Sequence, residues 1–102
     1  MAKFVYIFTG GQMADTPAAQ EEAMQAWGAW FETLGDAVAD IGNPFSTSAT
    51  VSTNGVASGA AGAASGYSIV TADSLDEAAA LAKGCPILTG GGTVEVYEAV
   101  PM

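Results

Sequence analysis

The side chains best suited to chemistry lie close together in segment 34–45, where Asp36, Asp40 and Asn43 stand among two glycines and a proline. Loops on rigid scaffolds often carry binding and catalytic groups. A carboxylate enclosed by apolar side chains has a raised pKa and can then act as a general base. Asp40 is therefore the candidate catalytic residue, with Asp36 as the second candidate. A structural role stands beside this one, because aspartates also hold turns through Asx hydrogen bonds.

Other catalytic and metal chemistry is restricted by what the chain lacks. It has no histidine and one cysteine, Cys85. The usual Ser–His and Cys–His nucleophile systems are therefore excluded, and no imidazole lowers the pKa of the Cys85 thiol. No internal disulfide can form, and no cluster of nitrogen and sulfur ligands indicates zinc. We expect no metal and no cofactor, and a packing role for Cys85 beside Pro86.

Charge and length narrow the classes of partner. The chain has two lysines and 11 acidic residues, so its formal net charge is −9 over 102 residues. Binding to nucleic acid needs cations that neutralise phosphates, and an anionic membrane surface attracts basic segments, so neither partner is expected. No apolar run reaches membrane-spanning length, and no secretory signal is evident at the start. The sequence predicts a single domain, 1–102, in a cytoplasmic protein.

Periodicity and end signals predict two helices and four strands. In chain order these are strand 3–9, helix 17–34, strands 47–53 and 66–72, helix 75–83 and strand 93–100. Thr16 and Pro17 give the first helix a cap and a proline at its first position. Ser74 and Glu77 form a capping box for the second, and Gly84 is placed to end it in the left-handed conformation.

This order predicts an α+β, ferredoxin-like βαββαβ fold, with a four-stranded antiparallel sheet and two helices on one face. The first and third strands are apolar on both sides, so the bare face needs cover. A symmetric homodimer, sheet against sheet, would supply it. Asn54-Gly55 indicates a turn. The small-residue stretch Val56–Ser65 is expected to form a mobile loop.

Aromatic residues suggest where a ligand would bind. Trp27, Trp30 and their neighbours share one face of helix 17–34, where core packing is the first explanation and a pocket wall the second. Gly28 indicates either close approach by another element or a tolerated weak point of the helix. The expected pocket is lined by Tyr6, Trp27, Trp30, Phe45 and Tyr67, with Asp40 and Asn43 as its orienting polar groups.

Several motifs resemble the YCII-related family of small dimeric α/β-barrel proteins. They are the stretch Gly66–Val70 with Asp73–Ala78, the ending Ala82–Pro86, and the turn and strand Gly91–Val96. The resemblance implies a ferredoxin-like fold, a dimer, and a pocket between sheet and helix. It also implies activities that are mostly unassigned, with some members acting as lyase- or dehalogenase-like enzymes on lactone-type compounds.

The chain departs from that pattern in two places. Enzyme-like members carry a His–Asp pair, whereas this chain has no histidine. Related members have an Asp-Gly-Pro-Phe motif before the third strand, where this chain has Val56–Ala61. Three functions therefore stay open: a dimeric protein that binds a small organic metabolite, a cofactor-free isomerase or lyase using Asp40 with a tyrosine such as Tyr67 as proton donor, and a non-catalytic structural or interaction module.

Overall fold

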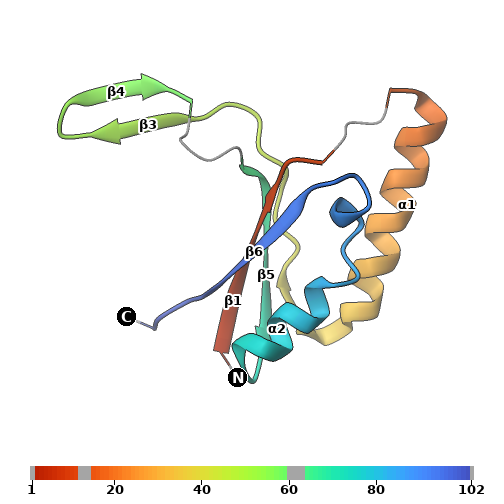
Figure 1. The fold of residues 1–102 in the computed structure, drawn as a ribbon. Coiled ribbons are helices and arrows are strands. Elements are labelled where there is room, and N and C mark those ends of the chain that lie inside the picture. The colour runs from red at the N-terminus through yellow and green to blue at the C-terminus, as the bar shows by residue number, and fades with distance from the viewer. Residues whose placement is uncertain (1, 12–14, 60–63, 102) are drawn as a thin grey trace.

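The computed structural model describes residues 2–11, 15–59 and 64–101. Within them the chain is α+β, with two α-helices and a four-stranded antiparallel sheet (Figure 1). The elements are β1 (Ala2–Thr9), α1 (Pro17–Leu34), the 3-10 turn η1 (Gly35–Ala37), β2 (Val38–Asp40), β3 (Ala49–Ser52), β4 (Gly55–Ser58), β5 (Ala64–Ala72), α2 (Leu75–Ala82), the 3-10 turn η2 (Pro86–Leu88) and β6 (Thr93–Glu98).

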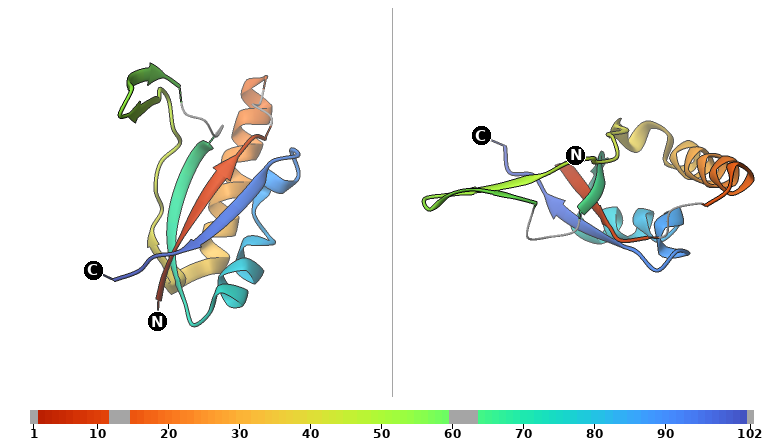
Figure 2. Two further views of the ribbon diagram at one scale, coloured as in Figure 1. Left: turned by 60° about the vertical axis from the view of Figure 1, so that its left-hand side comes forward. Right: turned by 90° about the horizontal axis from the view of Figure 1, so that it is seen from above.

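The main sheet has the strand order β2-β5-β1-β6, with the two longest strands at its centre. Phe4 lies opposite Val70 and Tyr6 opposite Ser68, so these side chains point to the same face of the sheet. All four are buried beneath the helices, whereas Val5 and the other odd-numbered residues of β1 point to the opposite face. Both helices lie on one side of the sheet, as the two views in Figure 2 show.

The helices begin where their capping signals predict. Thr16 Oγ1 accepts a hydrogen bond from the N–H of Ala19 at 3.1 Å, and Pro17 occupies the first turn. Ser74 Oγ accepts from the N–H of Glu77 at 3.1 Å. These bonds satisfy backbone donors that have no partner inside the helix, and thereby hold both helix starts.

The predicted role of Gly84 is wrong. Helix α2 ends at Ala82, followed by Lys83 in a right-handed conformation, and Gly84 has no positive φ. The glycine meets a different requirement, because a Cβ atom at this position would lie 3.2 Å from Cδ1 of Trp30. Close approach of the α1 tryptophan explains the small residue here.

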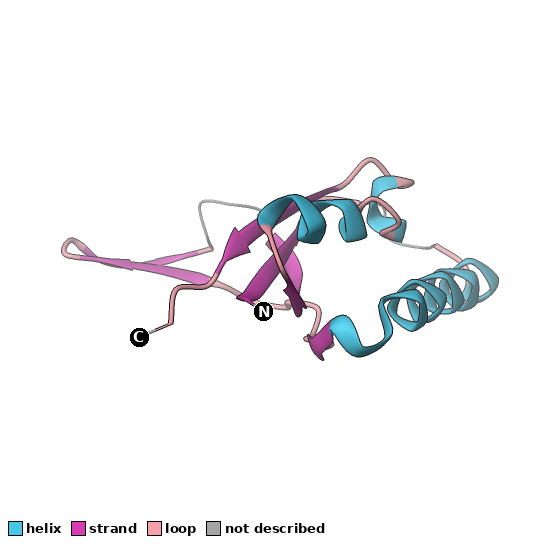
Figure 3. Cartoon of the chain, turned by 90° about the horizontal axis from the view of Figure 1, so that it is seen from below, coloured by secondary structure: helices cyan, strands magenta, loops and turns pink. Residues whose placement is uncertain are grey.

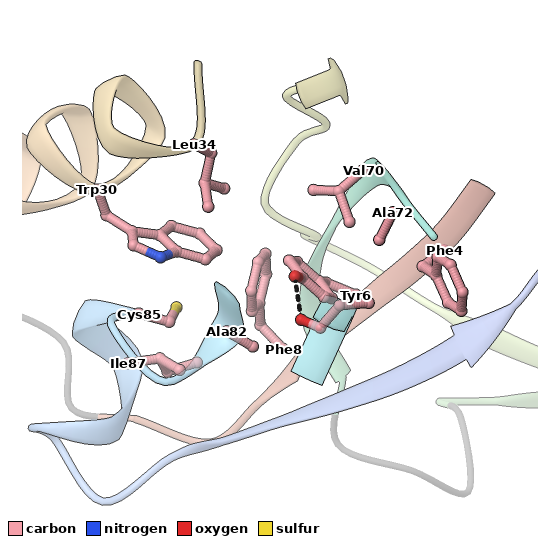
Figure 4. Close-up of a cluster of buried hydrophobic side chains, with 11 residues drawn as sticks. Phe4, Tyr6, Phe8, Trp30, Leu34, Val70, Ala72, Ala82, Cys85 and Ile87 are labelled. Carbon is pink, nitrogen blue, oxygen red and sulfur yellow. Dashed lines mark hydrogen bonds between the residues drawn. The ribbon is translucent and has the colours of Figure 1, made fainter. Parts of the chain in front are cut away.

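The core joins the helical face of the sheet to the C-terminal half of α1, to α2 and to η2 (Figure 4). Trp30 and Leu34 are the buried residues of α1. Trp30 Nε1 donates to the carbonyl of Leu81 at 3.1 Å, and the Tyr6 hydroxyl donates to the carbonyl of Ala78. Each aromatic residue therefore packs its ring and also satisfies a carbonyl of α2.

The second strand of the sheet is not where the sequence analysis placed it. Val38–Asp40, expected to be part of a loop, pairs with β5 and forms an edge of the sheet. The predicted strand 47–53 instead contains β3, which pairs only with β4 in a separate two-stranded sheet. Three residues of mixed polarity give almost no periodic signal, whereas the β-branched run at 47–53 gives a strong one.

Part of the expected loop Val56–Ser65 is also regular structure. Its first residues, up to Ser58, belong to β4, and Ala64 and Ser65 begin β5. The expected Asn54-Gly55 turn joins β3 to β4, with Gly55 at φ 124°. Residues 60–63 lie outside the described part of the chain. Small residues can pair as strands because the ladder uses backbone groups.

The sheet face opposite the helices is uncovered by any other element of the described chain. Val5, Ile7 and Ile69 lie on it, half-buried by their neighbours alone, and the Tyr97 side chain is 54% exposed. Across the described residues, neither helix is both long and apolar enough to cross a lipid bilayer. Lys3 and Glu95 are charged residues of this face, and its apolar side chains are unfavourably hydrated where water reaches them.

Candidate ligand-binding cleft

A cleft of about 580 Å³ separates the middle of α1 from the start of β5. One wall is α1, and the other is made by segment 41–44 together with residues 65–68. Phe8 and Ile87 lie between these walls. The cleft exists because α1 is held to the body at its C-terminal half, where Trp30 and Leu34 are buried. Toward its start the helix is exposed, and Met24 is 75% accessible.

Aromatic rings form the inner end of the cleft. The Trp27 ring meets Phe8 edge-on, with ring centroids 5.0 Å apart and an interplanar angle of 82°. The centroid of the Trp27 ring also lies 6.0 Å from that of Phe31 and 5.8 Å from that of Trp30. Edge-on and tilted contacts are favourable between aromatic rings, so this cluster is a firm apolar surface rather than a set of loose side chains.

Polar groups on the opposite wall are mostly used to hold the backbone. Ser68 Oγ donates to the carbonyl of Ile41 at 2.6 Å, and Ser65 Oγ donates to the carbonyl of Phe8 at 3.1 Å. The carbonyl of Asn43 accepts from the N–H of Tyr67 at 3.2 Å, while the residue as a whole is exposed. Its side-chain amide is therefore a polar group at the cleft that water or a ligand can reach.

Two glycines allow this wall to form. Gly42 has φ 74°, and a Cβ atom there would lie 1.8 Å from the carbonyl oxygen of Tyr67. Gly66 pairs with Pro44, and its Cβ would meet the carbonyl of Asn43 at 3.1 Å. Segment 42–45 can therefore run directly against the start of β5 only because both positions lack a side chain.

A second hollow, of about 630 Å³, adjoins the cleft near the first turns of α1. The two share Ala23, Trp27, Ser65 and Ile87 in their linings. The second hollow also reaches the Gly10-Gly11 turn and Glu22. Because Glu22 lines it, the second hollow is more polar than the cleft.

The structure brings only some of the predicted pocket residues to the cleft. Trp27, Asn43 and Tyr67 line it, whereas Tyr6 and Trp30 are buried in the core beside it. Burial raises the pKa of Tyr6 to about 12, with the nearby Cys85 as the smaller cause. Its hydroxyl is committed to the carbonyl of Ala78, which suits a structural role.

Phe45 and Tyr67 form a pair of their own. Their rings are stacked, with centroids 5.8 Å apart and an interplanar angle of 20°. Side chains alternate along β5, so the Tyr67 ring points to the sheet face opposite Ser68. Tyr67 therefore reaches the cleft mainly through its backbone, and the stacked pair borders the open face of the sheet.

The candidate general base, Asp40, is exposed at the end of β2. Its Oδ1 accepts a hydrogen bond from the N–H of Gly42 at 2.9 Å, which is an Asx turn. Asp40 is not among the described residues that line the cleft, and Asp36 is exposed in η1. In the single chain, Asp40 therefore lacks the apolar enclosure that the general-base hypothesis requires.

Cys85 is buried, and its pKa is raised to about 11 because burial outweighs the opposing hydrogen bond from the backbone of Ile87. A thiol with this pKa holds almost no thiolate at neutral pH, so it fits the packing role. Among the described residues, no group of three or more histidine, cysteine, aspartate or glutamate side chains is placed to hold a metal ion.

Comparison with known protein families finds a match over most of the chain. The YCII-related domain model matches residues 5–102. The chain belongs to the YCII-related family. The matched range includes both helices of this YCII-related chain and every strand of the sheet except the first three residues of β1. No curated protein sequence matches it.

Several lining residues of the YCII-related chain were not identified from the sequence. Met24 and Phe31 lie on the aromatic face of α1, one turn to either side of Trp27, and helical spacing alone places them together. Ile41 and Ser65 carry no such signal. They line the wall opposite α1 because the segment after β2 runs along β5, which is a tertiary contact.

Proposed function

We propose that this YCII-related protein binds a small, uncharged and largely apolar organic molecule in the cleft between α1 and the sheet. The size and lining of the cleft are the observations that support this proposal. Its volume of about 580 Å³ falls in the range of sites for small molecules. Aromatic and aliphatic side chains line it, with a few polar groups at its edge, which is the composition that such sites have.

The charge of the surroundings narrows the ligand class. No lysine, aspartate or glutamate occurs among the described residues that line the cleft. A bound cation would therefore lack a carboxylate partner, and an anion would lack a basic one within a chain of net charge −9. A flat, neutral ring system would stack on Trp27 and Phe31 and use the Asn43 amide for orientation.

The proposal includes a homodimer of ferredoxin-like subunits in the dimeric α/β-barrel arrangement. The strand order β2-β5-β1-β6, with one helix in each crossover, supports the ferredoxin-like description. The open sheet face, with Val5, Ile7 and Ile69, supports a sheet-to-sheet interface, because a second copy would remove it from water.

The geometry favours binding over the two alternatives. A general-base role for Asp40 needs an enclosed carboxylate, and the observed Asx turn gives Asp40 a structural role instead. A purely structural module would have its core filled, whereas the cleft leaves Trp27 and Met24 in contact with an open volume. We therefore place the function in the cleft.

Gly28 offers a direct test of the cleft. This residue lines the cleft, and a Cβ atom there would have no heavy atom within 4 Å. Gly28→Leu should fill the space without a backbone clash. The neutral fluorescent dye 1-aminoanthracene serves as probe, read by its emission and by energy transfer from tryptophan. We expect the variant to bind the dye at least about tenfold more weakly than the original chain.

Ala29→Leu is the matched control, because Ala29 is exposed on the same helix and does not line the cleft. Its dye affinity should stay within about twofold of the original chain, which is a free-energy change of under about 0.5 kcal/mol. Native mass spectrometry of the purified protein adds an independent reading, since a retained ligand should appear on the original chain and on the control but not on Gly28→Leu. Equal dye binding by both variants would place the ligand elsewhere.

A further inference from the structure

The hairpin formed by β3 and β4, here called the arm, stands away from the body of the molecule. Every residue of both strands is exposed, and the two strands pair only with each other. The arm lies between the lining segments 41–44 and 65–68 in the sequence, and it extends to the side opposite α1 (Figures 1 and 3). Seen from above in Figure 2, it overhangs the uncovered face of the sheet.

The arm exposes apolar side chains that are unfavourable in water. Val51 and Val56 are direct partners across the hairpin, so their side chains share one face, and they are 75% and 74% exposed. An isolated two-stranded hairpin is marginally stable at best, and three strands or a packing surface are needed for independent stability. The radius of gyration, 14.8 Å, also exceeds the value of about 13 Å expected for a compact chain of this length.

The edges of the arm lack the features that keep edge strands apart. Natural edge strands carry charges, prolines or bulges that prevent pairing with other chains. The arm has none of the first two, since no charged residue occurs between Asp40 and Asp73 and no proline occurs in β3 or β4. Its four residue pairs also run in register without a shift.

Charge indicates which partner fits the arm. The whole chain carries −9, so most of its surface repels a second copy of the same chain. The arm and the central sheet strand that follows it, β5, lie within the uncharged range 41–72. Ile69, on the open face beneath the arm, belongs to the same range. The arm and β5 can meet a second copy without bringing like charges together, whereas the rest of the open face carries Lys3 on β1 and Glu95 on β6.

We propose that the arm is an intersubunit clasp, which packs its Val51–Val56 face on the body of a second copy of this chain. The inference rests on the homodimer of the proposed function. When two open sheet faces meet, each arm already projects beyond its own sheet toward the other subunit. Packing there removes both valines from water and gives the hairpin the supporting surface that it lacks in one chain.

Neighbouring residues of β4 provide a matched pair of variants. Val56 and Ala57 are both exposed, and they point to opposite faces of the arm. Val56→Asp and Ala57→Asp therefore add the same charge at almost the same place. Sedimentation equilibrium should show a dimer dissociation constant raised about tenfold or more by Val56→Asp, and by less than about threefold by Ala57→Asp.

Hydrogen exchange gives a second reading on the unmodified chain. The amides of β3 and β4 should be protected above the dissociation constant of the dimer and should exchange faster on dilution below it, while the amides at the centre of β1 keep their protection. Rapid exchange of the arm amides in a dimer, or equal effects of the two aspartate variants, would overturn the clasp and leave the dimer intact. A chain that stays monomeric overturns both, whereas the dye measurement reports on the cleft alone.

Discussion

At the scale of single residues, Tyr6 links the sheet to α2. Its ring is fully buried against Trp30, with ring centroids 6.0 Å apart, and its hydroxyl donates to the Ala78 carbonyl. Removing the hydroxyl would remove this bond between the sheet and α2. Tyr6→Phe should therefore lower the free energy of unfolding by about 1 kcal/mol at pH 7, measured by urea unfolding followed by tryptophan fluorescence.

The same residue predicts a pH dependence. Folding raises the pKa of Tyr6 from 10.0 to about 12, so the folded chain holds this proton more tightly than the unfolded chain does. The corresponding stability is complete below pH 10 and is lost as the pH rises toward 12. Burial likewise raises the pKa of Cys85 from 9.0 to about 11, so its contribution to stability is also lost at high pH. Unfolding free energies should thus fall above pH 9, and above pH 10 they should fall less steeply in Tyr6→Phe. An identical slope in both proteins would contradict the assignment.

Gly42 tests the close approach that shapes the cleft wall. In Gly42→Ala the new Cβ would overlap the Tyr67 carbonyl, and the backbone would also have to keep φ 74°. We expect a loss of about 2–4 kcal/mol in the free energy of unfolding. Gly59→Ala is the control, because Gly59 has φ 85° but open space around its Cβ position. Gly59→Ala should lower the free energy of unfolding by only about 1–2 kcal/mol, which is the cost of the left-handed backbone conformation. Equal losses in Gly42→Ala and Gly59→Ala would disprove the role of the contact with Tyr67.

At the scale of elements, α2 depends on its first turn. It is short, Leu75–Ala82, and puts Ala78 and Ala82 into the core. Ser74→Ala removes the side-chain acceptor for the N–H of Glu77, so the free energy of unfolding should fall by about 1 kcal/mol. Ser74→Asp keeps an acceptor and should stay within about 0.5 kcal/mol of the original chain in the same denaturation experiment. Equal losses in both variants would show that capping is not the cause.

Helix α1 combines two roles along its length. Its C-terminal half is anchored by Trp30, through the ring contacts and the bond to Leu81, and by Leu34. Its middle leaves Ala23, Met24 and Gly28 facing an open volume. Gly28 has no close neighbour, so the close approach considered from the sequence is not made within this chain. The small residue instead widens the cleft.

At the scale of the whole molecule, the open face of the sheet decides how chains associate. Ile7 lies near its centre, between Tyr67 on β5 and Glu95 on β6. Ile7→Asp would put a charge into the proposed sheet-to-sheet interface. Sedimentation equilibrium should show the dimer dissociation constant raised by about 100-fold or more.

Ala80→Asp provides the control for that experiment, because Ala80 is exposed on α2, on the other side of the molecule. This variant adds the same charge and should dimerise as the original chain does. If both variants dimerise equally well, the open face is not the interface, and the uncovered apolar surface needs another explanation.

The local signals in the sequence determined most of the regular structure. Caps at Thr16 and Ser74, the apolar run along 3–9, the alternation along 66–72, and the Asn54-Gly55 turn each act within a few residues of the chain, so they can be identified without knowledge of the fold. The motifs around Gly66–Ala78 likewise indicated the family, which the match over residues 5–102 confirms. The charge of −9 and the missing histidine belong to the sequence alone.

Tertiary structure decided the rest. Val38–Asp40 forms an edge strand because β5 offers it backbone partners. Segment 47–53 has the stronger β propensity, yet its strand pairs within the arm and not with the main sheet. The cleft brings α1 opposite segment 41–44 and residues 65–68, and the Asp40 carboxylate accepts a hydrogen bond from the N–H of Gly42. Which face a strand buries follows from alternation along the chain, but which elements meet follows from long-range packing, and local sequence patterns do not contain that information.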